Sequence, residues 1–164
     1  TASSDIVDVR VISEQQAGTI ELVIMTKDGS PSEELIEKVL SICSADEIRP
    51  MNDIVTVVAP EIITYDIEIE YTVMDGNQAQ AIADLTGENG ACNRFAEYTG
   101  AKLGRDINPD LLLHYCMQSS IGETQGAVWS CKVLAPLPQE LTSGQVAKWS
   151  GNVLLHDPNV KFEE

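Results

Sequence analysis

The chain has 164 residues, 43% of them apolar and 5% aromatic, which is enough for one domain or two small ones with a core of mainly Ile, Val and Leu. Its 26 acidic and 10 basic residues give a net charge of −16, so the chain repels phosphate and is not expected to bind nucleic acid. No apolar run approaches the roughly 20 residues of a bilayer-spanning helix, so membrane insertion is not expected either.

Two strands are predicted first. Over residues 6–12, valines alternate with Asp8 and Arg10, and this period of two is typical of a strand. Residues 19–26 form the second strand, and its end is apolar on both faces, which favours a central position in a sheet. The short turn at 15–18 favours an antiparallel hairpin.

A helix is predicted to begin within Ser30-Pro31-Ser32-Glu33. Ser30 is placed to cap it, Pro31 fits the first helical position, and Glu33 completes a capping box. The apolar residues that follow share one face at three- and four-residue spacing, so the helix is expected to lie on a sheet. These residues are Leu35, Ile36, Val39, Leu40 and Cys43.

The rest of the chain is organised around Ala59-Pro60. A strand is predicted directly before this pair, at 54–58, and another after it, at 63–73, where polar and apolar residues alternate strictly. Proline cannot donate a hydrogen bond to a sheet and holds the preceding residue extended. The chain is therefore expected to leave one sheet and enter another at Pro60.

Beyond this junction, helical spacing extends over residues 78–103. Gly87 and Gly90 interrupt it, and each costs about 1 kcal/mol relative to alanine, so the helix is expected to bend or break there. A further helix is predicted from Asn108-Pro109-Asp110, where a cap precedes proline. The remaining predicted elements are a loop at 121–126 and strands at 127–134 and 145–155.

Together these elements predict an α+β protein of two small units, each a short, mainly antiparallel sheet with helices packed on one face. The first unit is expected at residues 1–60, in the order strand, strand, helix, strand. The second is expected at residues 61–157, in the order strand, helix, helix, strand, strand. Residues 158–164 are expected to form a loose tail.

Two groups of residues have a possible chemical role. His114 follows Asp106 by eight positions and is either a general base oriented by that carboxylate or an ordinary helical residue. Asp66, Glu68 and Glu70 share one strand face, but successive side chains lie roughly 7 Å apart, too far for one cation without other ligands. The structural interpretation is preferred for both groups, and no catalytic, cofactor-binding or metal-binding residues are predicted.

The four cysteines lack the close spacing of a metal site and are expected to be buried, reduced thiols, which suits synthesis in the cytosol. Trp129 and Trp149 lie on predicted strands, where they either pack in the core or anchor a partner interface. The cysteines are Cys43, Cys92, Cys116 and Cys131.

Several short motifs along the chain occur in the same order and at the same spacing as in a known protein family, and coincidence does not explain this agreement. They are Thr19 to Ile24, Ser30-Pro31-Ser32-Glu33, Arg49-Pro50 with Asp53, Val55-Thr56-Val57, Ala59-Pro60, Tyr65-Asp66-Ile67 and Leu103-Gly104-Arg105-Asp106-Ile107. Together they resemble the baseplate J-like proteins of contractile-tailed bacteriophages, over about residues 6–155.

This resemblance implies a structural, non-enzymatic component of a phage or prophage contractile-tail baseplate, located in the wedge and acting by protein–protein assembly. The implied partners are other baseplate or tail proteins and copies of the chain itself. The implied location is the virion tail baseplate, after synthesis and assembly in the bacterial cytoplasm. No small-molecule substrate or cofactor is expected. The resemblance covers the carboxy-terminal region of a family member and the chain starts at Thr1, so we expect a longer protein.

Alternatives remain open. A ferredoxin-like, small-ligand-binding regulatory domain also uses strand-strand-helix-strand units, and it would show a pocket with convergent polar groups. A small hydrolase would use Asp106 and His114. A contractile bacteriocin would use the same part as a phage baseplate.

Overall fold

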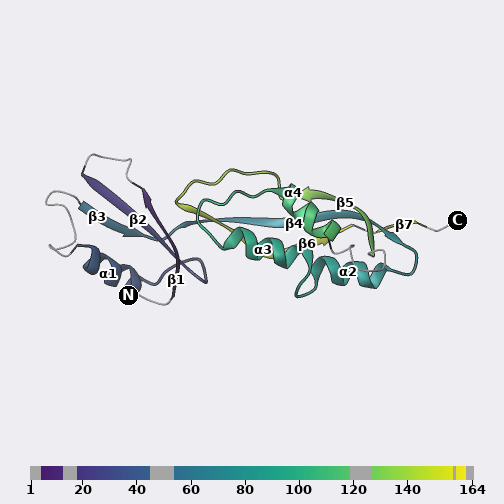
Figure 1. Ribbon diagram of the computed structural model, residues 1–164, viewed down its shortest axis with the longest axis horizontal. Helices are drawn as coiled ribbons and strands as arrows, with labels where there is room; N and C mark the ends of the chain where they lie inside the picture. The colour runs from purple at the N-terminus through teal and green to yellow at the C-terminus, as the bar shows by residue number, and fades with distance from the viewer. Residues whose placement is uncertain (1–4, 13–17, 45–53, 119–126, 157, 162–164) are drawn as a thin grey trace. The chain divides into compact units, whose positions relative to one another are not determined.

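The computed structural model describes residues 5–12, 18–44, 54–118, 127–156 and 158–161 (Figure 1). It has two compact units, and the first contains residues 1–63, 100–105 and 141–147 while the second contains 64–99, 106–140 and 148–164. The two sheets and their helices confirm the expected α+β class. The elements are β1 (Ile6–Ile12), β2 (Thr19–Thr26), α1 (Glu33–Cys43), β3 (Ile54–Val58), β4 (Glu61–Met74), α2 (Gln78–Thr86), α3 (Ala91–Gly100), α4 (Pro109–Gln118), β5 (Val128–Ala135), β6 (Gln145–Leu155) and β7 (Asn159–Lys161).

The first unit contains a three-stranded sheet in the order β1-β2-β3. β1 is antiparallel to β2, and β3 is parallel to β2 because α1 carries the chain back between them. The predicted hairpin and the central place of β2 are therefore confirmed. Residues 15–17 of the turn predicted at 15–18, and the motif residues Arg49, Pro50 and Asp53, lie outside the described residues.

Helix α1 begins at Glu33, and its cap is Ser32 rather than the expected Ser30. Ser32 is extended, with φ −72° and ψ 155°, and its hydroxyl accepts a 3.3 Å hydrogen bond from the Leu35 N–H. Pro31 therefore precedes the helix instead of occupying its first position. Glu33 and Glu34 fall in the first turn, where the helix dipole favours negative charge.

Both faces of β2 are covered, which explains why its end is apolar on both sides. On one face, Ile24 packs against Val39 of α1 and Val57 of β3. On the other face, Val23 and Met25 pack with two residues distant in the sequence. These are Leu103 and Val146, from the two return segments 100–105 and 141–147 that belong to the first unit.

Strand β1 has its apolar side exposed, an unusual arrangement for an alternating strand. The exposed fractions of Val7, Val9 and Val11 are 53%, 45% and 62%. α1 packs over β2 and β3, while the opposite face of β1 meets a return segment: the Asp8 carboxylate accepts a 3.0 Å hydrogen bond from the Leu103 N–H. The alternation therefore predicted the strand correctly without revealing which side is covered.

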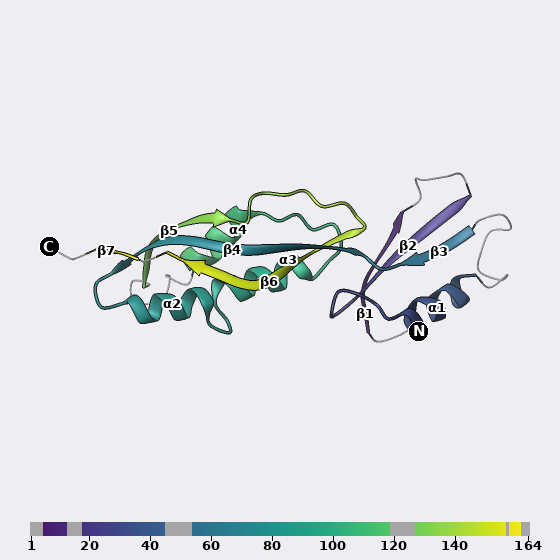
Figure 2. The same cartoon turned by 180° about the vertical axis from the view of Figure 1, so that it is seen from behind.

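β3 and β4 lie in different sheets on either side of Ala59-Pro60, which confirms the expected change of sheet. In the second sheet β4 lies between β5 and β6 (Figure 2). β5 is antiparallel to β4, and β7 is parallel to the end of β4. Thr72 and Val73 pair with β5 and also with β7, so β7 occupies the edge of β4 opposite to β5.

The expectation of a loose tail at 158–164 is wrong for the residues of β7. Asn159 to Lys161 pair with Thr72 to Met74, because the end of β4 offers an edge beyond the reach of β6. Asp157 and residues 162–164 lie outside the described residues, as does the loop predicted at 121–126.

The long helix predicted over 78–103 breaks at its glycines into α2 and α3. The Gly87 N–H donates to the Ala83 carbonyl at 2.8 Å, and the Gly90 N–H donates to the Gly87 carbonyl at 2.8 Å. A Cβ on Gly90 would lie only 2.8 Å from the Gly87 nitrogen, so this tight turn excludes a side chain there. Among the described residues, three helices and three strands therefore follow β4, where two of each were expected.

The core of the second unit is built on the alternation of β4. Tyr65, Ile67, Ile69, Tyr71 and Val73 are all buried on one face, as the sequence predicted. Helix α3 packs on this face: the Phe95 ring meets the Tyr65 ring edge-on, with centroids 5.7 Å apart. The Tyr65 hydroxyl is 2.8 Å from the buried Thr99 hydroxyl, which satisfies both groups.

Candidate functional site

The structure does not bring His114 and Asp106 into a catalytic pair. His114 lies on the exposed side of α4, with its ring 6.2 Å from the ring of Tyr115. Asp106 lines a separate recess of about 350 Å³, whose lining does not include His114. This geometry favours the structural interpretation of both residues.

The acidic face of β4 is paired with donors from other strands. The Asp66 carboxylate accepts hydrogen bonds from the Ser150 hydroxyl and, at 3.2 Å, from the Asn152 amide, both on β6. The Glu68 carboxylate lies 2.7 Å from the His156 ring. These partners are more than 80 positions away in the chain, so the spacing of residues could not reveal them.

Glu70, the last member of this acidic row, lies directly opposite Lys132 in the antiparallel register of β4 and β5. Opposite residues in such a register project from the same face of the sheet, so a cation stands beside this carboxylate. No group of three or more possible metal ligands occurs within the described ranges. The row is a hydrogen-bonded polar face of the sheet.

Three cysteines meet between α3, α4 and β5 as free thiols. Burial raises the pKa of Cys92 to about 12. A hydrogen bond between Cys116 and Cys131 raises the pKa of the Cys116 thiol, with burial adding to it, and lowers the pKa of Cys131. The expected burial holds for Cys92 and Cys116, whereas Cys43 and Cys131 are half-buried.

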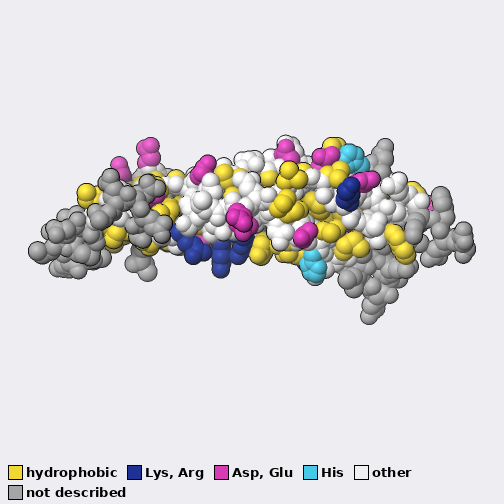
Figure 3. Space-filling model, turned by 90° about the horizontal axis from the view of Figure 1, so that it is seen from above, with side chains coloured by type: hydrophobic (Ala, Val, Ile, Leu, Met, Phe, Trp, Pro, Cys, Tyr) yellow, Lys and Arg dark blue, Asp and Glu magenta, His cyan; other side chains and the backbone are white. Residues whose placement is uncertain are grey.

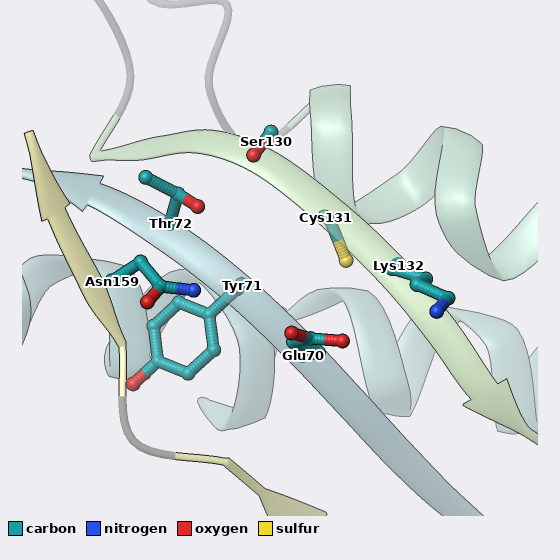
Figure 4. Close-up of a pocket in the computed structure, with 7 residues that line it drawn as sticks. All are labelled: Glu70, Tyr71, Thr72, Ser130, Cys131, Lys132 and Asn159. Atoms are coloured by element: carbon teal, nitrogen blue, oxygen red, sulfur yellow. The ribbon is translucent and has the colours of Figure 1, made fainter.

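Cys131 lines a recess of about 280 Å³ between β4 and β5. Figure 4 shows its sulfur directed from β5 toward the side of β4, where Glu70 and Tyr71 lie. The other lining residues are Thr72, Ser130, Lys132 and Asn159. The recess mixes one thiol, one carboxylate and one amine.

Neither tryptophan belongs to the buried core. Trp129 on β5 is 42% exposed. Trp149 on β6 is half-buried, and its ring N–H donates a 2.9 Å hydrogen bond to the Asn152 carbonyl. Core packing is therefore the wrong interpretation for Trp129, and its exposed ring suits a contact surface.

Exposed large apolar side chains occur on strands, on helices and in a loop of the described chain. On the face drawn in Figure 3, hydrophobic side chains lie exposed between carboxylates. Exposed apolar clusters of this kind are typical of protein–protein contact sites. The exposed large apolar residues are Val7, Val9, Val11, Ile42, Ile54, Ile62, Ile82, Tyr98, Trp129, Leu137, Leu154 and Val160.

None of the described helices has both the length and the apolar character of a membrane span. The ferredoxin-like alternative gains no support, because such folds follow the order strand, helix, strand, strand, helix, strand. The described strands and helix of the first unit instead run strand, strand, helix, strand.

Comparisons with known proteins found a family match for the first part of the chain and a structural match for most of it. Residues 1–59 match the family Baseplate J-like central domain, which confirms over those residues the resemblance seen in the sequence. A chain in the cryo-EM structure of the anti-feeding prophage (AFP) baseplate, 6-fold symmetrised, shares 15% sequence identity with a TM-score of 0.51. The match covers 90% of this chain and 34% of that chain, so this chain spans about a third of its length and shares its fold. No curated protein matches.

Proposed function

We propose that the chain is a structural component of a phage or prophage contractile-tail baseplate, because residues 1–59 match the family Baseplate J-like central domain. The single observation that carries this proposal is that family match. The fold shared with a chain of the AFP baseplate supports it over 90% of the sequence. In this role the chain belongs to the wedge and acts by protein–protein contact.

The proposed role is not enzymatic, and the described polar groups suit a structural protein. The carboxylates of Asp66 and Glu68 are held by cross-strand partners, and His114 is exposed on a helix. These contacts fix the surface of the second sheet rather than polarise a substrate. A baseplate component instead needs extended contact surfaces, which the exposed apolar side chains of both units provide.

The proposed partners are other baseplate or tail proteins and further copies of the chain. The proposed location is the tail baseplate of the particle, after synthesis and assembly in the bacterial cytoplasm. With a net charge of −16, the chain is best suited to partner surfaces that are basic or uncharged. A contractile bacteriocin would use the chain in the same way.

Gene deletion in the producing bacterium tests this function. Loss of the full-length protein is expected to abolish intact contractile particles in electron micrographs, and expression in trans is expected to restore them. A version carrying the surface change Glu97→Gln is the matched control and is expected to restore the particles as well. Normal particles without the protein would contradict the proposal.

A further inference from the structure

Strand β1 is chemically symmetric about its central residue, Val9. Its sequence is Ile-Val-Asp-Val-Arg-Val-Ile, so Val9 is flanked by matching residues on both sides. The pairs that mirror each other are Ile6 with Ile12, Val7 with Val11, and Asp8 with Arg10. The two apolar pairs have matching side chains, and the polar pair has opposite charges.

The outer edge of β1 is open in the part of the chain that the structure describes. β1 pairs with β2 along one edge, and it is the end strand of its sheet. The exposed fractions of Val7, Val9 and Val11, 53%, 45% and 62%, leave an apolar row beside that edge. An open edge with an apolar face is a template for pairing with another strand.

We propose that β1 pairs with β1 of a second copy of this chain, antiparallel and about a two-fold axis through Val9. This pairing specifies the self-contact of the proposed function and would join two three-stranded sheets into one. Residues directly opposite in an antiparallel pair share a face of the sheet. The register therefore sets Val9 against the partner's Val9 on one face. Val7, which has no partner on β2 at the irregularity between Ile6 and Asp8, lies near the partner's Val11.

On the other face, the same register sets Asp8 against the partner's Arg10, twice by symmetry. Within one copy Arg10 Nε already lies 3.7 Å from the Asp8 carboxylate, and 46% of the Arg10 side chain and 20% of the Asp8 side chain are exposed. The Asp8 carboxylate also accepts a 2.9 Å hydrogen bond from the Val9 N–H, and each carboxylate oxygen has a second lone pair for a further donor. A guanidinium has five N–H donors, so Arg10 has donors for both its own and the partner's Asp8. The two carboxylates and two guanidiniums then alternate across the axis.

Charge favours a second copy as the occupant of this edge. Two chains of net charge −16 repel each other, so a self-contact needs a surface that carries no net charge. β1 contains one acidic and one basic residue, and the two-fold register places Asp8 of each copy opposite Arg10 of the other copy. The other edge strand, β3, has no charged residue to fix a register, and only Ile54 is strongly exposed on it.

The contact is short, which sets its expected strength. Two seven-residue strands give an interface at the small end of specific complexes. The isolated chain is therefore expected to dimerise with a dissociation constant on the order of micromolar. The remainder of the assembly would add to this affinity through the effective concentration of linked sites.

Sedimentation equilibrium of the isolated chain tests the pairing. The unmodified chain is expected to show a monomer–dimer equilibrium. Arg10→Asp and Asp8→Arg each set like charges opposite each other, so each is expected to weaken the dimer by about tenfold or more. A mixture of these two variants is expected to form a heterodimer. Positions 8 and 10 are both acidic in one variant and both basic in the other, so opposite charges again face each other across the axis.

The controls separate loss of pairing from loss of fold. Asp8 also holds the Leu103 N–H, so circular dichroism and urea unfolding must show that Asp8→Arg is folded. Val9→Lys probes the same edge without touching that contact and is expected to give monomers. Ile54→Lys, on the opposite edge of the sheet, is the matched control and is expected to leave the dimer unchanged.

Each result decides for or against the pairing. A chain that is monomeric at high concentration, or a dimer that survives Val9→Lys and Arg10→Asp, overturns it. So does a mixture of the two charge variants that stays monomeric while both are folded. A full-length protein that carries Val9→Lys and still enters contractile particles would leave the baseplate function intact, so the two proposals fail separately.

Discussion

The ring Nε2 of His156 lies 2.7 Å from Oε1 of Glu68, although the two residues are 88 positions apart in the sequence. The backbone N–H of His156 also donates a 3.0 Å hydrogen bond to the Ile69 carbonyl. His156, which directly follows β6, therefore contacts β4 through both its side chain and its backbone. This relationship holds the acidic face of β4 beside its partner strand.

The Glu68–His156 pair is exposed, so its removal is expected to cost little. The exposed fractions of the two side chains are 36% and 43%, and exposed ion pairs contribute about 0–1 kcal/mol. His156→Ala should therefore lower the free energy of unfolding by less than about 1 kcal/mol, measured by urea denaturation. Glu97→Gln is a control on an exposed helix position. A loss above 2 kcal/mol would show that the pair does more than hold a surface.

Leu103 is expected to contribute far more to the free energy of unfolding than His156 does, because its side chain covers one face of the first sheet. It is buried with Val23, Met25 and Val146. Leu103→Ala leaves a cavity in this cluster and should cost about 2–5 kcal/mol in urea unfolding. Leu137→Ala is the matched control, since Leu137 is 76% exposed and should change stability by about 0.5 kcal/mol or less.

Equal effects of the two leucine substitutions would contradict this assignment of the return segments to the first unit. The assignment also bears on the proposed division of the chain at Pro60. A fragment of residues 1–60 would leave Val23 and Met25 without Leu103 and Val146. We therefore expect independent folding of the first unit to require the segments 100–105 and 141–147.

Tyr65 should titrate late in the folded protein. Burial raises its pKa from 10.0 to about 12, while its hydrogen bond to Thr99 acts in the opposite direction. A raised pKa means that the folded state holds the proton more tightly, so the stabilisation is full below about pH 10 and is lost as pH rises through about 12. Ultraviolet titration of the phenolates, compared with Tyr65→Phe, checks this. The variant is expected to lose the part of the absorbance change that the unmodified chain shows near pH 12. If the variant instead lost absorbance change near pH 10, the raised pKa of Tyr65 would be contradicted.

The thiols should react in an order set by burial and hydrogen bonding. Cys131 is half-buried, lines the recess between β4 and β5, and has a lowered pKa, because it accepts a hydrogen bond from Cys116. Cys92 and Cys116 are buried, and both have raised pKa values. A disulfide reagent at pH 8 should therefore modify Cys131 well before these two, because the thiolate is the nucleophile.

Mass spectrometry of peptides measures the order in which the thiols react. The Cys43→Ser variant is used because Cys43 is also half-buried and would otherwise react as well. Unfolding in urea should make the three rates similar. Modification of Cys92 ahead of Cys131 in the folded chain would show that the packing between α3, α4 and β5 differs from the structure.

Local patterns predicted much of the fold, and long-range contacts account for what they missed. The alternation over β4 predicted its buried face because one face meets the core along its whole length. The same pattern on β1 could not reveal that the valines lie outside, since that depends on where α1 and Leu103 lie in space. Ser30 and Ser32 both satisfy the rules for a cap, and only the geometry shows that Ser32 is the cap.

The candidate site divides in the same way. The sequence correctly suggested a polar strand face at Asp66, Glu68 and Glu70, but its donors on β6 and beyond it are too distant in the chain to be found by spacing. Strand β7 was missed because three residues are too few to show a period, and its pairing depends on an edge left open by β6. The mirrored charges of β1 were visible in the sequence and gained meaning only with its exposed edge.

Cryo-EM of the contractile particle from the producing bacterium, with the protein carrying a small tag, tests the central claim most directly. The account predicts density for both sheets of this chain within the baseplate, in contact with neighbouring protein subunits, and tag labelling confined to that end of the particle. Particles whose baseplate contains no copy of the chain, with the tagged protein recovered only in the soluble fraction, would contradict it.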